Sequence, residues 1–157
     1  MRDYIDLTLL TLEGISKTAG RPIDEQAYLE SIEIAMNHGL LFEVRRNGIL
    51  LSYATLKDMG SGTWFILMFV THPYHRTKQV FGELFSKIIA HLETVKACKL
   101  VSNVLKVNKL SLAFHRKLGF TITREADIGF EFTMDLDSPN AQHWKQWSKQ
   151  FYNEINA

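Results

Sequence analysis

The first forty residues carry two apolar stripes at helical spacing, each followed by residues that end helices. The first stripe consists of Ile5, Leu9, Leu12 and Ile15, and it ends at Gly20-Arg21-Pro22. The second follows Asp24, a good helix N-cap, and consists of Tyr28, Ile32, Ala35 and Met36, with Gly39 at its end. The pattern predicts two helices before the first strand.

The middle of the chain has the patterning of strands. Residues 41–45 and 49–55 are expected to pair around Asn47-Gly48, because Asn-Gly is the strongest short hairpin signal. Residues 63–71 are almost continuously apolar, which predicts a strand covered on both faces. An amphipathic helix over 80–95 and a strand over 100–105 then follow, so strands 63–71 and 100–105 should be parallel and diverge at their carboxyl ends.

The last third of the chain predicts two more helices and two more strands. Asn108 caps a short helix that runs through Lys117 and ends at Gly119, and strands follow over residues 120–124 and 128–136. A final helix begins after Asp137-Ser138-Pro139 and carries Trp144, Trp147, Phe151 and Ile155 on one side. The order predicts a mixed α/β (α+β) fold with a central mixed sheet flanked by helices.

Composition narrows the class of protein. The chain has 157 residues, 46% apolar and 22% charged, with a net charge of +1, which fits one domain over residues 1–157 and offers no global field for nucleic acid or a membrane. The single Cys98 excludes an internal disulfide, and the six histidines show no metal-ligand spacing, so we expect no metal. Because the longest apolar run, residues 64–70, is too short to span a bilayer and Asp3, Asp6 and Glu13 interrupt any signal peptide, we expect a cytoplasmic protein.

The turn between residues 72 and 85 is a candidate anion site. It joins the buried strand to the start of the long helix, where free backbone amides and the positive end of the helix dipole favour a group such as a pyrophosphate. Arg76 and Lys78 add positive charge. An ordinary strand-to-helix turn with solvated cations would look the same.

A second stretch, residues 104–120, gives the turn a more specific meaning. Together the two segments resemble the GCN5-related N-acetyltransferase (GNAT) family. Pro73, His75 and Arg76 match the family pattern that opens the helix holding the coenzyme A pyrophosphate, and Val104, Asn108 and Lys117-Leu118-Gly119-Phe120 match the later pattern. The resemblance covers residues 41–136, so residues 138–157 are a helical extension.

The resemblance implies a GNAT-like acyl-CoA N-acyltransferase fold and acetyl-CoA as co-substrate. It places the acetyl-CoA site on two segments. These are the run Arg76, Thr77, Lys78, Gln79, Val80, Phe81 and Gly82, whose amides from Thr77 onward would hold the pyrophosphate, and Asn108, which would hold the pantetheine arm or the thioester. The catalytic residue it implies is His115, in the position of the family tyrosine that protonates the departing thiolate.

The sequence departs from the family at four points. Thr77, Gln79 and Phe81 replace the three loop glycines, and the Phe81 ring must either point into helix packing, leaving Gly82 for the close approach to phosphate, or block the cofactor. The usual first strand is missing, residues 63–71 contain no carboxylate for a general base, and histidine replaces tyrosine at position 115.

Each candidate has an ordinary alternative. His115 could simply face solvent on a short helix, and His72, which precedes a proline, ranks below it as a turn residue that could line the cleft. Glu43, Tyr53 and Asp58 lie on or near the hairpin and are ordinary surface or core residues by default. The basic cluster of Lys106, Lys109, Arg116 and Lys117 could meet coenzyme A phosphates, form a solvated helix face or touch nucleic acid locally.

The expected function is transfer of the acetyl group of acetyl-CoA to an amine acceptor by direct attack. The rival is a GNAT-like binding or assembly module that has lost catalysis. Degenerate glycine loops also occur in GNAT-like proteins of tailed phages, some carried in virions or linked to DNA modification, which keeps a phage origin open. The aromatic terminal helix could pack on the sheet, form a homodimer or dock in a larger assembly.

Overall fold

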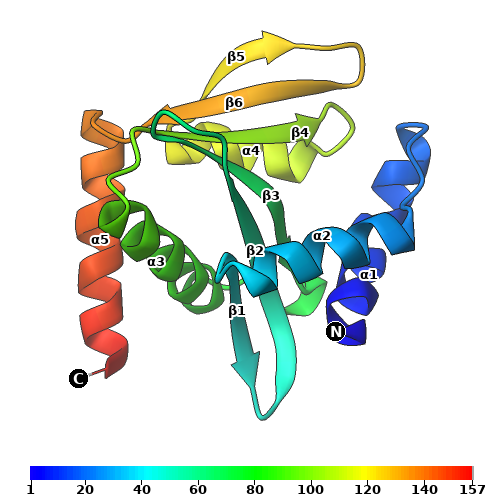
Figure 1. The fold of residues 1–157 in the computed structure, drawn as a ribbon, viewed down its shortest axis with the longest axis horizontal. Helices are drawn as coiled ribbons and strands as arrows, with labels where there is room; N and C mark the ends of the chain where they lie inside the picture. Colours follow the sequence, from blue (N-terminus) through cyan, green and yellow to red (C-terminus); the bar gives the residue numbers. More distant parts are fainter. Residues whose placement is uncertain (157) are drawn as a thin grey trace.

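The computed structural model describes the backbone of residues 1–156 and the side chains of residues 1–150. Figure 1 shows a twisted sheet with helices on both faces. In chain order the elements are α1 (Arg2–Thr18), α2 (Glu25–Asn37), β1 (Leu41–Arg46), β2 (Ile49–Asp58), β3 (Thr63–Thr71), the 3₁₀ turn η1 (Pro73–His75), α3 (Lys78–Thr94), β4 (Lys99–Leu105), α4 (Lys109–Leu118), β5 (Thr121–Glu125), β6 (Gly129–Asp135) and α5 (Pro139–Asn156).

The predicted order of helices and strands is confirmed. Two helices precede the first strand, so the usual first strand of the family is absent from the described residues. Strand β2 is three residues longer than expected, because residues 56–58 continue the ladder with residues 64–66 of β3. The β1–β2 turn has positive φ at both Asn47 (54°) and Gly48 (79°), as a type I′ hairpin requires.

The predicted helix caps are present. Asp24 accepts a hydrogen bond from the Ala27 amide at 3.2 Å, and Asn108 accepts one from the Ser111 amide at the same distance. Ser138 accepts from the Ala141 amide at 3.2 Å, and Gly119 ends α4 in the left-handed region at φ 95°. Local sequence therefore sets where these helices begin and end.

The six strands form one mixed sheet in the order β1-β2-β3-β4-β6-β5. Strands β3 and β4 are its one parallel pair, joined by the α3 crossover, and all other neighbours are antiparallel. The parallel pairing runs from Thr63↔Lys99 to Ile66↔Ser102 and then stops. The expected divergence of the two strands at their carboxyl ends is thus confirmed, and it opens a gap in the middle of the sheet.

A bulge in β3 lies at the start of this gap. Thr55 of β2 faces Met68 while Leu56 faces Ile66, so Leu67 is the extra residue. Because side chains alternate along a strand, one extra residue moves everything after it to the opposite face. Trp64 and Ile66 before the bulge therefore share a core with Phe69 after it.

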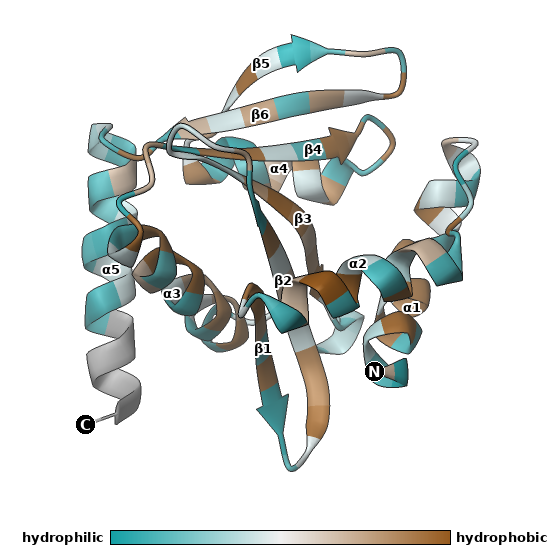
Figure 2. Cartoon of the chain, viewed as in Figure 1, coloured by the Kyte–Doolittle hydropathy of each residue, from teal (hydrophilic) through white to brown (hydrophobic). Residues whose placement is uncertain are grey.

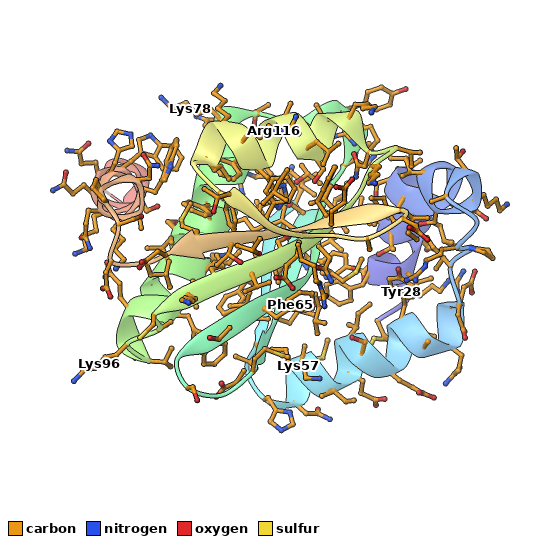
Figure 3. The ribbon with its side chains drawn as sticks, turned by 90° about the horizontal axis from the view of Figure 1, so that it is seen from above. Tyr28, Lys57, Phe65, Lys78, Lys96 and Arg116 are labelled. Atoms are coloured by element: carbon orange, nitrogen blue, oxygen red, sulfur yellow. The ribbon has the colours of Figure 1, made fainter. Side chains whose placement is uncertain are left out.

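The two faces of the sheet carry separate cores. On one face α3, α4 and α5 cover a large cluster that includes Leu84, Ile88, Leu100 and Phe132. On the other, α1 and α2 cover a smaller cluster around Ile5, Ile32 and Tyr53. Figure 3 shows this layering from above, with Arg116 on α4 on one side of the sheet and Tyr28 on α2 on the other.

The terminal helix α5 packs beside α3. Trp144 and Trp147 are partly buried against the larger core, and the indole N–H of Trp144 donates to the Leu118 carbonyl at the end of α4 over 2.6 Å. Trp144 and Trp147 therefore pack within the protein. Phe151 and Ile155 lie outside the described side chains. The part of α5 that Figure 2 colours is otherwise largely hydrophilic.

The described part of the chain contains no group of three or more His, Cys, Asp or Glu side chains that could hold a metal ion. None of its helices is long and apolar enough to cross a membrane. Cys98 is an exposed free thiol.

Candidate active site

A cleft of about 930 Å³ opens where β3 and β4 part. Its walls come from six elements, and α1 and α5, which contribute Leu12 and Trp147, lie on opposite sides of the molecule (Figure 1). Ile66 and Ser102, the last paired residues of the parallel strands, both line it. A concave site of this size at the carboxyl ends of parallel strands is a typical place for a ligand.

The start of α3 forms one rim of the cleft. Thr77 is the N-cap, and its hydroxyl accepts from the Val80 amide at 3.2 Å while its carbonyl accepts from the Phe81 amide at 3.0 Å. The Thr77 amide itself donates to the His75 carbonyl at 2.9 Å. The first amides of the helix, those of Lys78 and Gln79, remain to face an anion.

The predicted cofactor residues divide into two groups. Those that line the cleft are Arg76, Thr77, Lys78, Phe81 and Asn108, whereas Gln79, Val80 and Gly82 do not. Val80 and Gly82 are buried in the first turns of α3. The amide run expected from Thr77 to Gly82 therefore shortens to the first residues of the helix, because later amides are used inside it.

Phe81 points into aromatic packing. Its ring stacks on Phe85 and on Trp147, with ring centroids 5.2 Å and 5.9 Å apart, and it meets Phe114 edge-on with centroids 4.8 Å apart. The sequence allows this ring either to point into helix packing or to block the cofactor. In the structure it points into the packing and forms part of the cleft wall. Gly82, the residue expected to give the close approach to phosphate, does not line the cleft.

The basic cluster splits between the cleft and the surface. Lys109 and Lys117 of α4 line the cleft together with Arg76 and Lys78, so four cationic side chains surround its rim. Lys106 instead pairs with Glu125 at 2.7 Å. Arg116 is exposed and does not line the cleft.

His115 lies half-buried in the cleft wall, on the inner side of α4. Its Nδ1 lies 2.8 Å from the Ser111 carbonyl and its Nε2 lies 3.0 Å from the Ser102 hydroxyl. Burial lowers the pKa of His115 more than the hydrogen bond to the Ser111 carbonyl raises it, so the ring is neutral near pH 7. The surface alternative for this residue is wrong, because the ring packs between Phe120 and Phe132.

The four other polar residues singled out in the sequence have structural contacts and do not line the cleft. His72 caps η1 by accepting from the Tyr74 amide at 3.1 Å, and Asp58 accepts from the Gly60 amide at 2.8 Å. Glu43 accepts from the Tyr4 hydroxyl and pairs with Arg45. Burial raises the pKa of Tyr53 to about 12, so this phenol stays neutral.

Sequence reasoning missed Ser102. Its position in β4 lies between the core residues Leu100 and Val104, two residues from each, so it shares their face of the sheet. A polar side chain at an inward position requires a buried hydrogen-bond partner. That break in the apolar pattern is the signal that could have identified it.

A sheet whose central parallel pair parts beside a helix N-terminus defines the class of acyl-CoA N-acyltransferase folds. A model of the acetyltransferase (GNAT) family matches residues 7–120, and the chain belongs to this family. The match begins in α1, well before the stretch in which the motifs were found, and ends just after α4.

Solved structures share the fold at low sequence identity. PaiA N-acetyltransferase from Thermoplasma acidophilum, in complex with coenzyme A, is 13% identical with a TM-score of 0.70, covering 85% of this chain and 91% of that one. The ribosomal-protein-S18-alanine N-acetyltransferase from Escherichia coli is 15% identical with a TM-score of 0.65, covering 87% and 88%. YncA from Salmonella typhimurium, with its cofactor acetyl-CoA, is 22% identical with a TM-score of 0.57, covering 75% and 77%. No curated protein sequence matches this one.

Proposed function

We propose that this protein transfers the acetyl group of acetyl-CoA to an amine. The observation that carries the proposal is the cleft itself, which combines a cationic rim, a gap between parallel strands and a half-buried imidazole in one continuous site. Family membership supports the reaction class. Coenzyme A and acetyl-CoA in PaiA and YncA support the co-substrate.

The rim suits the phosphates of acetyl-CoA. The amides of Lys78 and Gln79 and the positive end of the α3 dipole would face the pyrophosphate, with Arg76 and Lys78 beside it. Lys109 and Lys117 would meet the phosphates from α4. Several partly exposed cations around one anion make this binding sensitive to salt.

The gap between the strands suits the pantetheine arm. Residues 68–71 of β3 pair with β2 on one side, and residues 103–105 of β4 pair with β6, but the two segments do not pair with each other. Their facing backbone groups can therefore bind the amides of the arm. The apolar wall of Phe69, Phe81 and Phe114 covers its aliphatic parts.

The chemistry is direct attack of the amine on the thioester carbonyl, with His115 moving one proton. Because the resting imidazole is neutral, it first takes up the proton that the attacking nitrogen loses. The resulting imidazolium then supplies the proton for the departing sulfur. His115 therefore has two roles in sequence. It is first the general base, which β3 does not supply, and then the proton donor in the position of the family tyrosine.

The side of the cleft that α1 lines is mainly apolar, and we expect the acceptor to bind there. Leu12 and Ile15 of α1 line it near Val70 of β3, with Thr11 as the polar contribution from the same helix. An amine on an apolar or aromatic carrier would bury surface there. We therefore expect such amines to be better acceptors than spermidine.

The test is release of free coenzyme A thiol from acetyl-CoA in the presence of amines. The panel contains an arylamine, spermidine, a peptide with a free amino terminus and a peptide with an internal lysine. We expect thiol release that depends on the amine, with a matching acetylated product by mass spectrometry. Saturable acetyl-CoA binding without transfer to any amine would favour the binding-module alternative.

A further inference from the structure

Ser102 is a buried hydroxyl at the point where the central strands separate. It is 6% exposed, faces Ile66 in the last rung of the parallel ladder and lines the cleft. Leu100 and Val104, on the same face of β4, belong to the apolar core. Within the described part of the chain, the hydrogen-bond partner of the Ser102 side chain is His115.

The direction of that hydrogen bond follows from the other side of the ring. A carbonyl oxygen can only accept, so the 2.8 Å contact with the Ser111 carbonyl requires the proton on Nδ1. In the neutral ring Nε2 then carries a lone pair, and the Ser102 hydroxyl donates to it over 3.0 Å. A hydroxyl that donates to an imidazole held by a third group is ready to pass its proton to that imidazole.

The surroundings hold the pair in place. Phe120 and Phe132 lie 5.1 Å from the imidazole and Phe114 lies 6.3 Å from it, between ring centroids. The side chains that face the ring from α4 and β4 are otherwise the two serines. The charged or titratable groups that share the cleft are Arg76, Lys78, Lys109, Lys117 and His143.

We propose that Ser102 is the group that touches the reacting atoms and relays the proton between them and His115. This rests on the proposed acetyl transfer. As the C–N bond forms, the nitrogen gives its proton to Ser102 Oγ, and the Ser102 proton moves to His115 Nε2. As the C–S bond breaks, the sulfur takes a proton from Ser102 Oγ, which is refilled from His115. One proton has moved from nitrogen to sulfur, and both residues regain their starting state.

The experiment compares Ser102→Ala, His115→Phe and the double variant in the full chain. Each single change should reduce turnover about 10²-fold or more. The double variant should be no slower than His115→Phe, because both changes remove the same proton-transfer path and their effects do not add. Acetyl-CoA affinity should stay within about twofold of the parent's. The matched control is Ser86→Ala, which also removes a 6% exposed hydroxyl but lies outside this cleft.

A second measurement does not depend on turnover. Ser102→Ala removes the donor that stabilises neutral His115, so the pKa of His115, followed by NMR in the free protein, should rise. An unchanged pKa, parental turnover of Ser102→Ala, or losses that multiply in the double variant would each overturn the relay. An acetyl ester on Ser102 after incubation with acetyl-CoA would overturn it in favour of a nucleophilic serine. A parent protein with no transfer activity would refute the proposed function, while the NMR result would still report on the hydrogen bond.

Discussion

His115 shows how much of a residue's chemistry is fixed by its neighbours. On its own a histidine titrates near neutrality and could serve as an acid or a base. Here the Ser111 carbonyl fixes the proton on Nδ1, and burial lowers the pKa of the ring. The resting side chain is consequently a base that becomes an acid during the reaction.

The first prediction concerns the pH dependence of this residue. Because His115 must start neutral, kcat/KM should rise with pH through its lowered pKa, below about 6.5, and level off above it. His115→Phe should remove this limb and reduce kcat by about 10² to 10⁴. Steady-state rates between pH 5 and 8 check both points. A rate that instead falls as pH rises through this range would mean that the resting ring is the acid.

At the same scale, the sequence predicts several residues that line the cleft, but it does not predict how their side chains are oriented. Arg76, Lys78, Asn108 and His115 could be named from motifs, and all four line the cleft. The orientation of Phe81 could not be predicted, since it depends on Phe114 and Trp147 from distant elements. Ser102 belongs to no motif, and its one signal is the polar break in the apolar face of β4.

At the scale of elements, α5 closes the aromatic side of the cleft. Trp144 and Trp147 line the cleft beside Phe81, and the Trp144 indole is hydrogen-bonded to the end of α4. The helix therefore contributes to the wall of the site as well as to stability. The sequence does not predict this role, because it shows an aromatic stripe without showing its partner.

The second prediction is that removing residues 138–157 lowers the melting temperature and weakens acetyl-CoA binding. The deletion exposes Phe81 and Phe85, which now contact Trp147 and Trp144. Trp144→Phe is a smaller change, because it keeps an aromatic ring but removes the hydrogen-bond donor to the Leu118 carbonyl. It should lower the free energy of unfolding by about 1 kcal/mol. Thermal unfolding and calorimetry measure both effects. A truncated protein with unchanged melting temperature would show that α5 contributes nothing to this packing.

Elements with local signals were predictable and the bulge was not. The caps at Asp24, Asn108 and Ser138 and the turn at Asn47-Gly48 depend on neighbouring residues only, so the sequence places them. The extra residue Leu67 lies in a strand that is apolar on both faces. Alternation is absent there, so no pattern records the change of register.

At the scale of the whole molecule, two half-buried histidines link folding to pH. Burial lowers the pKa of His91, which packs between Phe42 and Trp64, and burial also lowers that of His115. In the unfolded chain both rings take up protons near pH 6.5. Below that pH the unfolded state binds more protons than the folded state, so folding stability must fall as pH falls.

The third prediction follows from this linkage. Denaturant unfolding should give a lower free energy of unfolding at pH 5.5 than at pH 7.5. We choose pH 5.5 because ordinary carboxylates are still ionised at this pH. Replacing His91 and His115 together by Phe should make the difference smaller. Equal pH dependence in the parent and the double variant would refute this assignment.

The central claim is that the cleft binds acetyl-CoA despite its altered glycine loop, and calorimetric titration of acetyl-CoA into the full chain tests it most directly. We expect saturable binding that weakens with added salt and in Arg76→Ala, while Arg116→Ala, a cation outside the cleft, leaves it unchanged. Absence of saturable binding at millimolar acetyl-CoA, in protein that unfolds cooperatively, would contradict the account.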